Sequence, residues 1–224
     1  MISVKIIADS KNAYNESRVT TFELEYPRFI HSEIMTHREF SRNAQSSRAV
    51  PVDKTLEVNQ EIVTPLVWGK NKSGMSSTEV LEGDDLENAK YWWGSAGHWA
   101  KIFSKNLNQA GLHKQWANRI TEPFSRIKVV LTSTDRGLQN FFWLRRDPDA
   151  AQPEIVELAD QMYEAYNNSV PRILQTGDWH MPYVERGEHS DFVDDEGVPL
   201  TTEEALHISA SCCAQVSYRK LNTK

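Results

Sequence analysis

Two segments near the N-terminus alternate hydrophobic and polar positions, which is the pattern of β-strands. They cover residues 2–8 and 19–26, and the second reads V-T-T-F-E-L-E-Y. A third strand-like run, residues 124–133, is rich in β-branched side chains. Pro27 allows a helix to begin, and F-I-H-S-E-I-M follows it. These runs predict a mixed or antiparallel sheet with helices inserted between its strands.

Hydrophobic residues at helical spacing predict long helices elsewhere. One covers residues 77–108, and a second, L-H-K-Q-W-A-N-R-I, follows Gly111. Residues 135–146 form another, which Thr134 or Asp135 can cap. The residues from E-E-A-L to V-S-Y form a last helical stretch at the C-terminal end. Two helices show one hydrophobic face each: Leu81, Ala89, Trp92, Trp93, Ala96, Trp99 and Phe103 in the first, and Ile155, Leu158, Ala159, Met162, Tyr163 and Tyr166 within 154–167.

The remaining segments indicate one domain and not several. Residues 51–76 and 176–202 are rich in turn-forming residues and are expected to be loop-rich. The sequence has no internal repeat, low-complexity tract or clear linker. We therefore expect residues 1–224 to form a single α+β domain, with a mixed or antiparallel sheet flanked by long helices.

Composition narrows the class of protein. The chain has 224 residues, of which 39% are hydrophobic and 25% charged, as in an ordinary globular protein. No hydrophobic run is long enough to cross a bilayer, and the N-terminus lacks the pattern of a signal peptide. A net charge of −6 argues against a general nucleic-acid binder. We expect a cytoplasmic protein that binds neither membranes nor nucleic acid.

The segment 36–50, T-H-R-E-F-S-R-N-A-Q-S-S-R-A-V, stands out against this acidic background. It holds three arginines, one histidine and three serines, with a single acidic residue. Arginine forks and short hydroxyl groups are well suited to phosphate oxygens. The alternative is a solvated basic face. Because few local acids can pair with these arginines, the segment indicates a site for a small anionic ligand.

The helix 135–146 carries polar residues on two sides. Arg136 and Asn140 are four residues apart and project from one face. Arg145 lies roughly 180° from Arg136, on the side of the hydrophobic residues. An arginine in that position needs an anion or a carboxylate, and Asp147 and Asp149 are alternative partners. If both faces bind ligands, this helix serves two sites or lies at a subunit interface.

Signatures of several other enzyme classes are absent from the sequence. There is no G-x-G-x-x-G, Walker loop, G-x-S-x-G or H-E-x-x-H motif, and the histidines have no metal-ligand spacing. We expect no metal site. Cys212 and Cys213 are adjacent, which favours small core residues over a reactive thiol.

Three segments together resemble the flavin-dependent thymidylate synthases, and specifically their phage-type members. The family's R-H-R-x7-S-x-R signature is matched by His37, Arg38, Ser46 and Arg48. The segment N-R-I-T-E-P at 118–123 is similar to the family's A-R-x-x-L-P. Finally, R-G-L-Q-N-F-F-W-L-R with A-Q-P-E-I is similar to R-S-L-x-N-F-x-x-L-R…A-Q-x-E-I. The order of the three motifs is more specific than any one of them.

The resemblance implies an activity and a set of ligands. The family transfers a methylene group from methylenetetrahydrofolate to dUMP, with reduced FAD as the hydride donor and NADPH as the reductant. It forms homotetramers whose sites are shared between subunits, and a phage-encoded member acts in the host cytoplasm. Related products, from dUMP hydroxymethylation or dCMP methylation, and a non-catalytic nucleotide-binding subunit are the alternatives.

The resemblance also implies roles for individual residues. Arg145 is expected to be catalytic, by polarising the pyrimidine ring. The expected cofactor-binding residues are His37, Arg38, Asn43, Arg136 and Asn140, and the expected substrate-binding residues are Glu33, Gln45, Ser46, Ser47, Arg48, Arg119 and Arg145.

Several positions depart from the family pattern. Thr36 replaces the first arginine of the signature, Ala44 a glutamate and Ala49 a tyrosine. The C-terminal A-S-C-C-A-Q-V-S-Y-R-K is similar to A-A-R-V-S-Y-G-K, which lies near the N-terminus of family members, and Gln215 replaces its arginine. The chain therefore resembles a circular permutation. The family's flavin-holding S-P-F-E-H segment is then expected after Lys224, so the resemblance implies a shortened or split chain or an incomplete flavin site.

Overall fold

A five-stranded sheet in the order β3-β4-β2-β1-β5 forms the centre of the fold. The computed structural model describes residues 2–73, 77, 79–187, 192–194 and 196–218. The strands of the sheet are β1 (Ser3–Asn12), β2 (Arg18–Pro27), β3 (Ser41–Ala44), β4 (Arg126–Thr134) and β5 (Arg172–Leu174). All neighbouring pairs are antiparallel except β1 and β5, which are parallel. The prediction of a mixed sheet in an α+β fold is confirmed.

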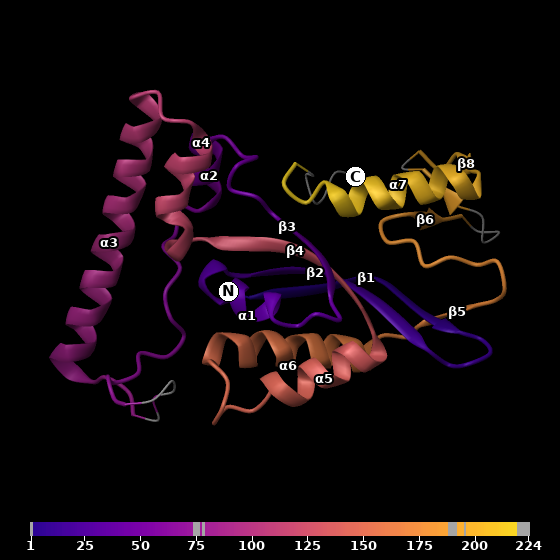
Figure 1. Ribbon diagram of the computed structural model, residues 1–224, viewed down its shortest axis with the longest axis horizontal. Coiled ribbons are helices and arrows are strands. Elements are labelled where there is room, and N and C mark those ends of the chain that lie inside the picture. Colours follow the sequence, from indigo (N-terminus) through magenta and orange to yellow (C-terminus); the bar gives the residue numbers. More distant parts are fainter. Residues whose placement is uncertain (1, 74–76, 78, 188–191, 195, 219–224) are drawn as a thin grey trace.

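Helices α5 and α6 cover one face of this sheet, and a second, smaller sheet lies at one end of the molecule (Figure 1). Helices α5 and α6 lie below the sheet in that view, and α7 lies above it. The helical elements are η1 (Arg28–Ile30), α1 (His31–Met35), α2 (Val52–Val58), α3 (Gly83–Gln109), α4 (Lys114–Ala117), η2 (Asn118–Phe124), α5 (Asp135–Arg145), α6 (Pro153–Asn168) and α7 (Thr202–Ala214). The small sheet consists of β6 (Glu185–Arg186), β7 (Phe192–Val193) and β8 (Pro199–Leu200).

The core lies between the sheet and the helices α5 and α6. Strand β2 contributes Phe22, Leu24 and Tyr26, and these alternate side chains are fully or almost fully buried. Across them, α6 contributes the stripe predicted from the sequence, in which Tyr163 is partly buried and the other five residues are buried. Leu138, Phe141 and Phe142 of α5 belong to the same core, which fixes this helix, the carrier of three predicted site residues, against the sheet.

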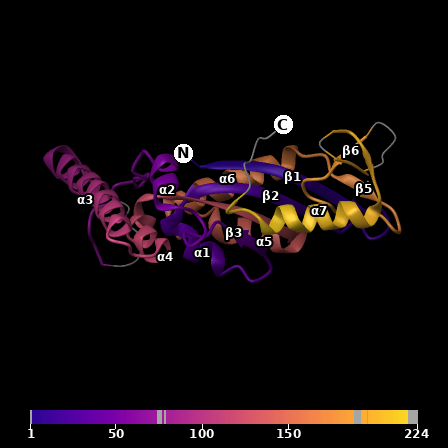
Figure 2. The same ribbon diagram turned by 90° about the horizontal axis from the view of Figure 1, so that it is seen from above.

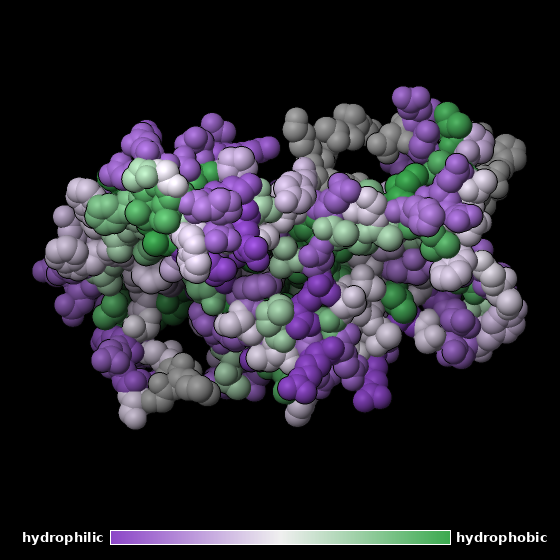
Figure 3. All heavy atoms as spheres, turned by 45° about the horizontal axis from the view of Figure 1, so that its top comes forward, coloured by the Kyte–Doolittle hydropathy of each residue, from purple (hydrophilic) through white to green (hydrophobic). Residues whose placement is uncertain are grey.

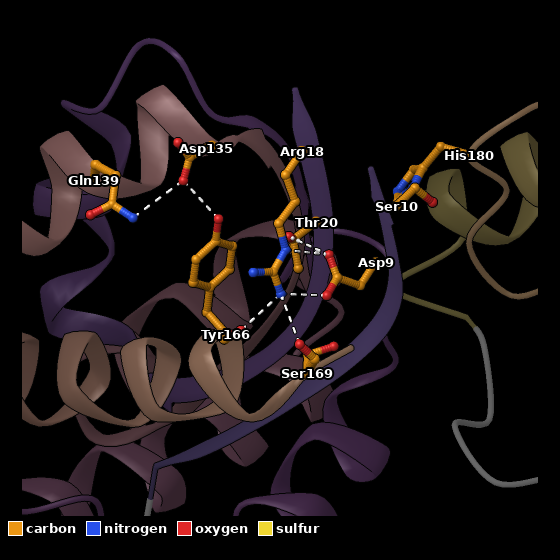
Figure 4. A network of polar contacts seen from close by, with 9 residues as sticks. All are labelled: Asp9, Ser10, Arg18, Thr20, Asp135, Gln139, Tyr166, Ser169 and His180. Atoms are coloured by element: carbon orange, nitrogen blue, oxygen red, sulfur yellow. Dashed lines mark hydrogen bonds and ion pairs between the residues drawn. The ribbon is translucent and has the colours of Figure 1, made fainter. Parts of the chain in front are cut away.

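A chain of polar contacts ties α5 and α6 to strands β1 and β2 (Figure 4). Arg18 donates to both carboxylate oxygens of Asp9, with Nε–Oδ1 at 2.9 Å, and its guanidinium lies 3.7 Å from the centre of the Tyr166 ring. The Tyr166 hydroxyl donates to Asp135 at 2.7 Å, in the first turn of α5. Burial alone would raise the pKa of Asp9, but hydrogen bonds from Arg18 and Ser169 outweigh it and lower that pKa. The ion pair is therefore compensated within the core.

The sequence-based prediction for the long helix α3 was wrong about its buried face. The helix begins at Gly83 and is 27 residues long, but Trp92, Trp99 and Phe103 are 68%, 54% and 52% exposed. The buried positions are instead Gly97 and Ser104, and Trp93 donates from Nε1 to the carbonyl of Val63 at 2.8 Å. A glycine allows this close contact, because a Cβ at Gly97 would lie 2.8 Å from the Ile62 side chain. Figure 2 shows α3 extending from one end of the molecule, away from the sheet.

Other segments differ in detail from the expectations. The loop-rich segment 51–76 contains α2, and the segment 176–202 contains β6 to β8. The predicted second helix is a four-residue α-helix continued by the 3-10 helix η2. Cys212 and Cys213 are half-buried and not core residues, since α7 exposes that side. Among the described residues, no helix is both long enough and hydrophobic enough to cross a bilayer.

Candidate functional site

A cavity of about 330 Å³ lies between the segment 36–40 and helix α5. Four of the predicted site residues line it: His37, Arg38, Asn140 and Arg145. The cavity therefore joins two motifs that lie about a hundred residues apart in the sequence. Thr36, Glu39, Phe40, Gly137 and Leu144 complete its wall.

Arg145 is the most highly coordinated side chain in this cavity. Its Nε donates to His37 Nε2 at 3.0 Å and its Nη2 to the Thr36 hydroxyl at 3.4 Å. Its Nη1 lies 3.5 Å from a carboxylate oxygen of Glu33, on α1. The carboxylate partner that Arg145 requires is thus Glu33, and not Asp147 or Asp149.

His37 is held as a neutral hydrogen-bond acceptor. A guanidinium group can only donate, so the bond from Arg145 requires a lone pair on Nε2 and places the ring proton on Nδ1. Burial, followed by the charges of Arg145 and Arg42, lowers the pKa of His37 from 6.5 to about 4. The ring also packs edge-on against Phe141 of α5, with 4.9 Å between ring centroids. At neutral pH, His37 orients Arg145 without adding a charge.

The segment 35–40 is folded around the side chain of Arg42. This guanidinium donates to the carbonyls of Met35, His37 and Phe40 at 2.8–2.9 Å. The sequence had suggested that the 36–50 segment as a whole binds an anion, with specific roles for Arg38 and Arg48. Arg42 instead has a structural role, because its donors satisfy backbone acceptors that the tight loop cannot pair with itself.

Helix α5 forms the other side of the cavity with residues from along its length, from Gly137 near its start to Arg145 at its end. Thr134 caps the helix by accepting from the Gly137 amide at 3.4 Å, as predicted. Gly137 allows α5 to lie close to the 36–40 loop and to β4, because a Cβ there would meet the Ser133 hydroxyl at 2.3 Å and the Glu39 Cβ at 3.2 Å. Arg136 is largely exposed, and its Nε lies 3.4 Å from Glu39. Asn140 is also exposed, at the rim.

Asn43 points away from this cavity. Its amide nitrogen donates to the carbonyls of Cys213 and Ala214, at 2.9 and 2.8 Å. These are carbonyls at the C-terminal end of α7, which have no partner within the helix. The neighbouring Gln45 continues the pairing with β4 by donating its backbone amide to the Lys128 carbonyl at 2.8 Å. In this chain Asn43 therefore anchors α7.

The next residues, Ser46 to Ala49, form a turn beside η2. The Ala49 amide donates to the Ser46 carbonyl at 3.1 Å, and the Arg48 amide lies 3.3 Å from the Ser46 hydroxyl. The side-chain amide of Asn118 donates to the carbonyl of Ser47 at 2.8 Å. This bond brings the turn beside Arg119, the residue that follows Asn118.

Two arginines beside this turn have no anionic partner in the part of the chain that the structure describes. Arg48 is exposed, with no ion pair to a described residue, and Arg119 lies 5.8 Å above the centroid of the Trp116 ring. The pKa of the nearby Arg28 is lowered, mainly by burial and further by the positive charge of Arg119, although the charge of Glu122 acts to raise it. The turn thus lies in a positive region suited to an anion.

Apart from Asn43 and Gln45, which bond to α7 and β4, the predicted residues therefore fall into two groups. His37, Arg38, Asn140 and Arg145 line the cavity, with Glu33 and Arg136 at its edge, whereas Ser46, Ser47, Arg48 and Arg119 lie beyond β3 and do not line it. Glu39 and Phe40 also line the cavity and were not predicted as site residues, although both lie inside the 36–50 segment. Within the described residues, no cluster of three or more His, Cys, Asp or Glu side chains could hold a metal ion.

Comparison with known proteins gives an independent view of the chain. Two solved structures with a similar fold are of the UMP/dUMP methylase PolB from Streptomyces cacaoi, one bound with 5-Br dUMP and the other with 5-Br UMP. The first is 19% identical, with a TM-score of 0.60, and the match covers 74% of this chain and 90% of that chain. The second is 20% identical, with a TM-score of 0.59, and covers 74% and 88%. A search among curated proteins finds no match.

A match to a family model covers most of the chain. Residues 5–172 match the model described as "Thymidylate synthase complementing protein". This range includes strands β2, β3 and β4, most of β1 and the first residue of β5, together with the cavity and the Ser46–Ala49 turn. The match confirms the family resemblance of the three motifs, and the chain belongs to the thymidylate synthase complementing protein family.

Proposed function

We propose that this protein methylates a pyrimidine nucleoside monophosphate, most simply dUMP to dTMP, with FAD as cofactor and methylenetetrahydrofolate and NADPH as co-substrates. The observation that carries this proposal is the cavity in which Arg145, oriented by His37, meets the residues of the family motif. Family membership and the fold shared with a UMP/dUMP methylase support the same reaction class.

The residues at the cavity suit part of a flavin. A volume of about 330 Å³ is at the lower end for a ligand site and accommodates a ring system, but not a whole dinucleotide. Arg38, Arg136 and Asn140 are exposed at the rim, where they can donate to ring carbonyls or to a diphosphate. When bound, the flavin would supply the hydride needed to complete the methyl group.

Arg145 would stabilise negative charge that develops on the pyrimidine ring. Its fork is held from two sides, by His37 and Glu33, so it needs little reorganisation when the charge forms. Because His37 is neutral and accepts from Arg145, it leaves the full positive charge of the arginine available.

The nucleotide phosphate would bind at the Ser46–Ala49 turn. The hydroxyl of Ser47 and the guanidinium groups of Arg48 and Arg119 provide charge-assisted donors there. This turn does not line the cavity. A single chain would therefore provide an incomplete site for a ligand that must contact both the cavity and the turn. We therefore propose that subunits of a homotetramer share their sites, so that the cavity of one subunit meets the turn of another. The expected location is the cytoplasm.

Binding and turnover test this proposal. Purified protein should bind FAD, seen as a change in the visible absorption of the flavin, and should oxidise NADPH when dUMP and methylenetetrahydrofolate are present. A protein that fails to bind FAD in excess would contradict the cofactor assignment. Binding of FAD and nucleotide without NADPH oxidation would favour the alternative of a non-catalytic subunit.

Arg145→Ala should abolish turnover while the fold is kept. Arg146→Ala is the matched control, because Arg146 pairs with Asp160 and stacks on Tyr163 and does not line the cavity. Circular dichroism would verify that both variants are folded. Unchanged turnover in Arg145→Ala, or equal losses in the two variants, would remove Arg145 from the mechanism.

A further inference from the structure

The segment that follows α7 contacts the turn to which we assign the phosphate. The backbone amide of Ser46 donates to the hydroxyl of Ser217 at 2.9 Å, across 171 residues of sequence. Two further bonds, from Asn43 to the carbonyls of Cys213 and Ala214, hold the end of α7 to β3. The C-terminal segment thus reaches the anion-binding motif directly.

The C-terminal segment is held in this position by contacts of its own. Val216 is 5% exposed, and the Tyr218 amide donates to the Gln215 carbonyl at 2.9 Å to close a turn. Further back, the Ser209 hydroxyl is buried and donates to the Pro182 carbonyl at 2.7 Å. Ser217 therefore has a fixed position, and its bond to Ser46 is one of several contacts that hold the segment.

The bond from Ser46 fixes the start of the turn. Gln45 is held by β4 through its own amide, and Ser47 is held by Asn118 through its carbonyl. Ser217 supplies the contact between these two, on the residue from which the turn begins. With its amide committed to Ser217, Ser46 directs its hydroxyl to the Arg48 amide, 3.3 Å away. The order of the turn thus depends on a hydroxyl outside the motif.

We propose that Ser217 is a positioning residue of the nucleotide-binding side: it holds the Ser46 amide so that Ser47 and Arg48 are presented to the phosphate. This inference rests on the proposed function, which places the phosphate at the turn. It assigns a role to the segment after α7 that lies outside the residues matched by the family, 5–172. None of the described residues after α7 lines the cavity, so flavin binding should not depend on this segment.

Ser217→Ala tests the proposal in the full chain. Loss of one backbone-to-hydroxyl bond should weaken dUMP binding about five-fold, seen as a higher Kd and KM with kcat unchanged. The Kd for FAD should stay the same. Ser217→Thr keeps the hydroxyl and should restore affinity. Ser211→Ala removes an α7 hydroxyl whose partner among the described residues is Gln215, and it should bind like the wild type.

Hydrogen exchange reports on the Ser46–Ser217 hydrogen bond separately from its effect on dUMP affinity. In Ser217→Ala without ligand, the Ser46 amide should exchange faster than in the wild type, a result that does not depend on the nucleotide. Faster exchange with unchanged dUMP affinity would overturn the positioning role, and so would tighter dUMP binding or an equal loss of FAD binding. If the wild type binds no nucleotide, the proposed function fails and this inference fails with it, whatever the exchange rate shows.

Discussion

Because His37 is neutral in the folded chain, we predict that acid lowers the free energy of unfolding. In the folded chain the pKa of His37 is about 4, because the side chain is buried and lies beside Arg145 and Arg42. The unfolded chain binds a proton on this residue near its ordinary pKa of 6.5. Between these values the unfolded state holds more protons than the folded state, so acid favours unfolding.

The size of this effect follows from the two pKa values. Each pKa unit corresponds to 1.36 kcal/mol, so the difference between 6.5 and about 4 corresponds to about 3 kcal/mol. Water in the adjoining cavity screens the charge of Arg145, which reduces the figure to about 2 kcal/mol. This stability is fully present above pH 6.5, is lost as the pH falls toward 4, and changes no further below that.

Urea unfolding of the wild type and of His37→Gln at several pH values between 7 and 4 measures the effect. Glutamine keeps an acceptor for Arg145 but does not titrate, so the difference between the two proteins isolates His37. The wild type should lose about 2 kcal/mol more than the variant across this range. Other histidines whose pKa is lowered, such as His180, contribute equally to both curves. Parallel curves would refute the placement of a neutral His37 against Arg145.

Two further predictions concern the scaffold of the site. Asp9→Asn leaves the largely buried guanidinium of Arg18 without its counter-charge. Urea unfolding should show that the free energy of unfolding falls by about 3–5 kcal/mol. Glu16→Gln, at an exposed surface pair, is the control and should change it by less than about 0.5 kcal/mol. Gly137→Ala should weaken FAD binding and lower the melting temperature, because the new Cβ would lie 2.3 Å from the Ser133 hydroxyl of β4. Gly94→Ala on α3 is the control: its Cβ would meet nothing within 4 Å, so this change should be neutral or stabilising. Equal melting temperatures for the two glycine variants would show that α5 can move away from β4.

Much of the fold could be predicted because local patterns and burial agree. Strand β2 and helix α6 each bury one face at the period of their own secondary structure, and Thr134 caps α5 as expected. Helix α3 was harder, because tryptophan has a large hydrophobic surface wherever it lies. Its buried stripe is marked by Gly97 and Ser104, small residues that the hydrophobic pattern ignores. Figure 3 shows hydrophobic residues exposed at this end of the molecule, around α3 and α4.

The candidate site was predictable as a set of motifs, but not as a geometry. The sequence could place Arg145 on the hydrophobic side of its helix, but the partner that it needs, Glu33, comes from a helix more than a hundred residues away. Likewise, nothing in the spacing of the arginines distinguishes Arg42, which holds the backbone of its own loop, from Arg48, which is exposed. Long-range pairing decides these roles, and a single sequence does not record it.

Isotope transfer to the nucleotide tests the central claim most directly. The protein would be incubated with FAD, NADPH and methylenetetrahydrofolate labelled with carbon-13 at the methylene carbon, in parallel with dUMP, UMP and dCMP. Mass spectrometry should find the label in a methyl group on the pyrimidine formed from dUMP, and none with Arg145→Ala. A hydroxymethyl product, or a labelled product from dCMP alone, would leave the family assignment unchanged but would assign a different reaction to the protein. No labelled nucleotide from any of the three substrates would contradict the proposed activity.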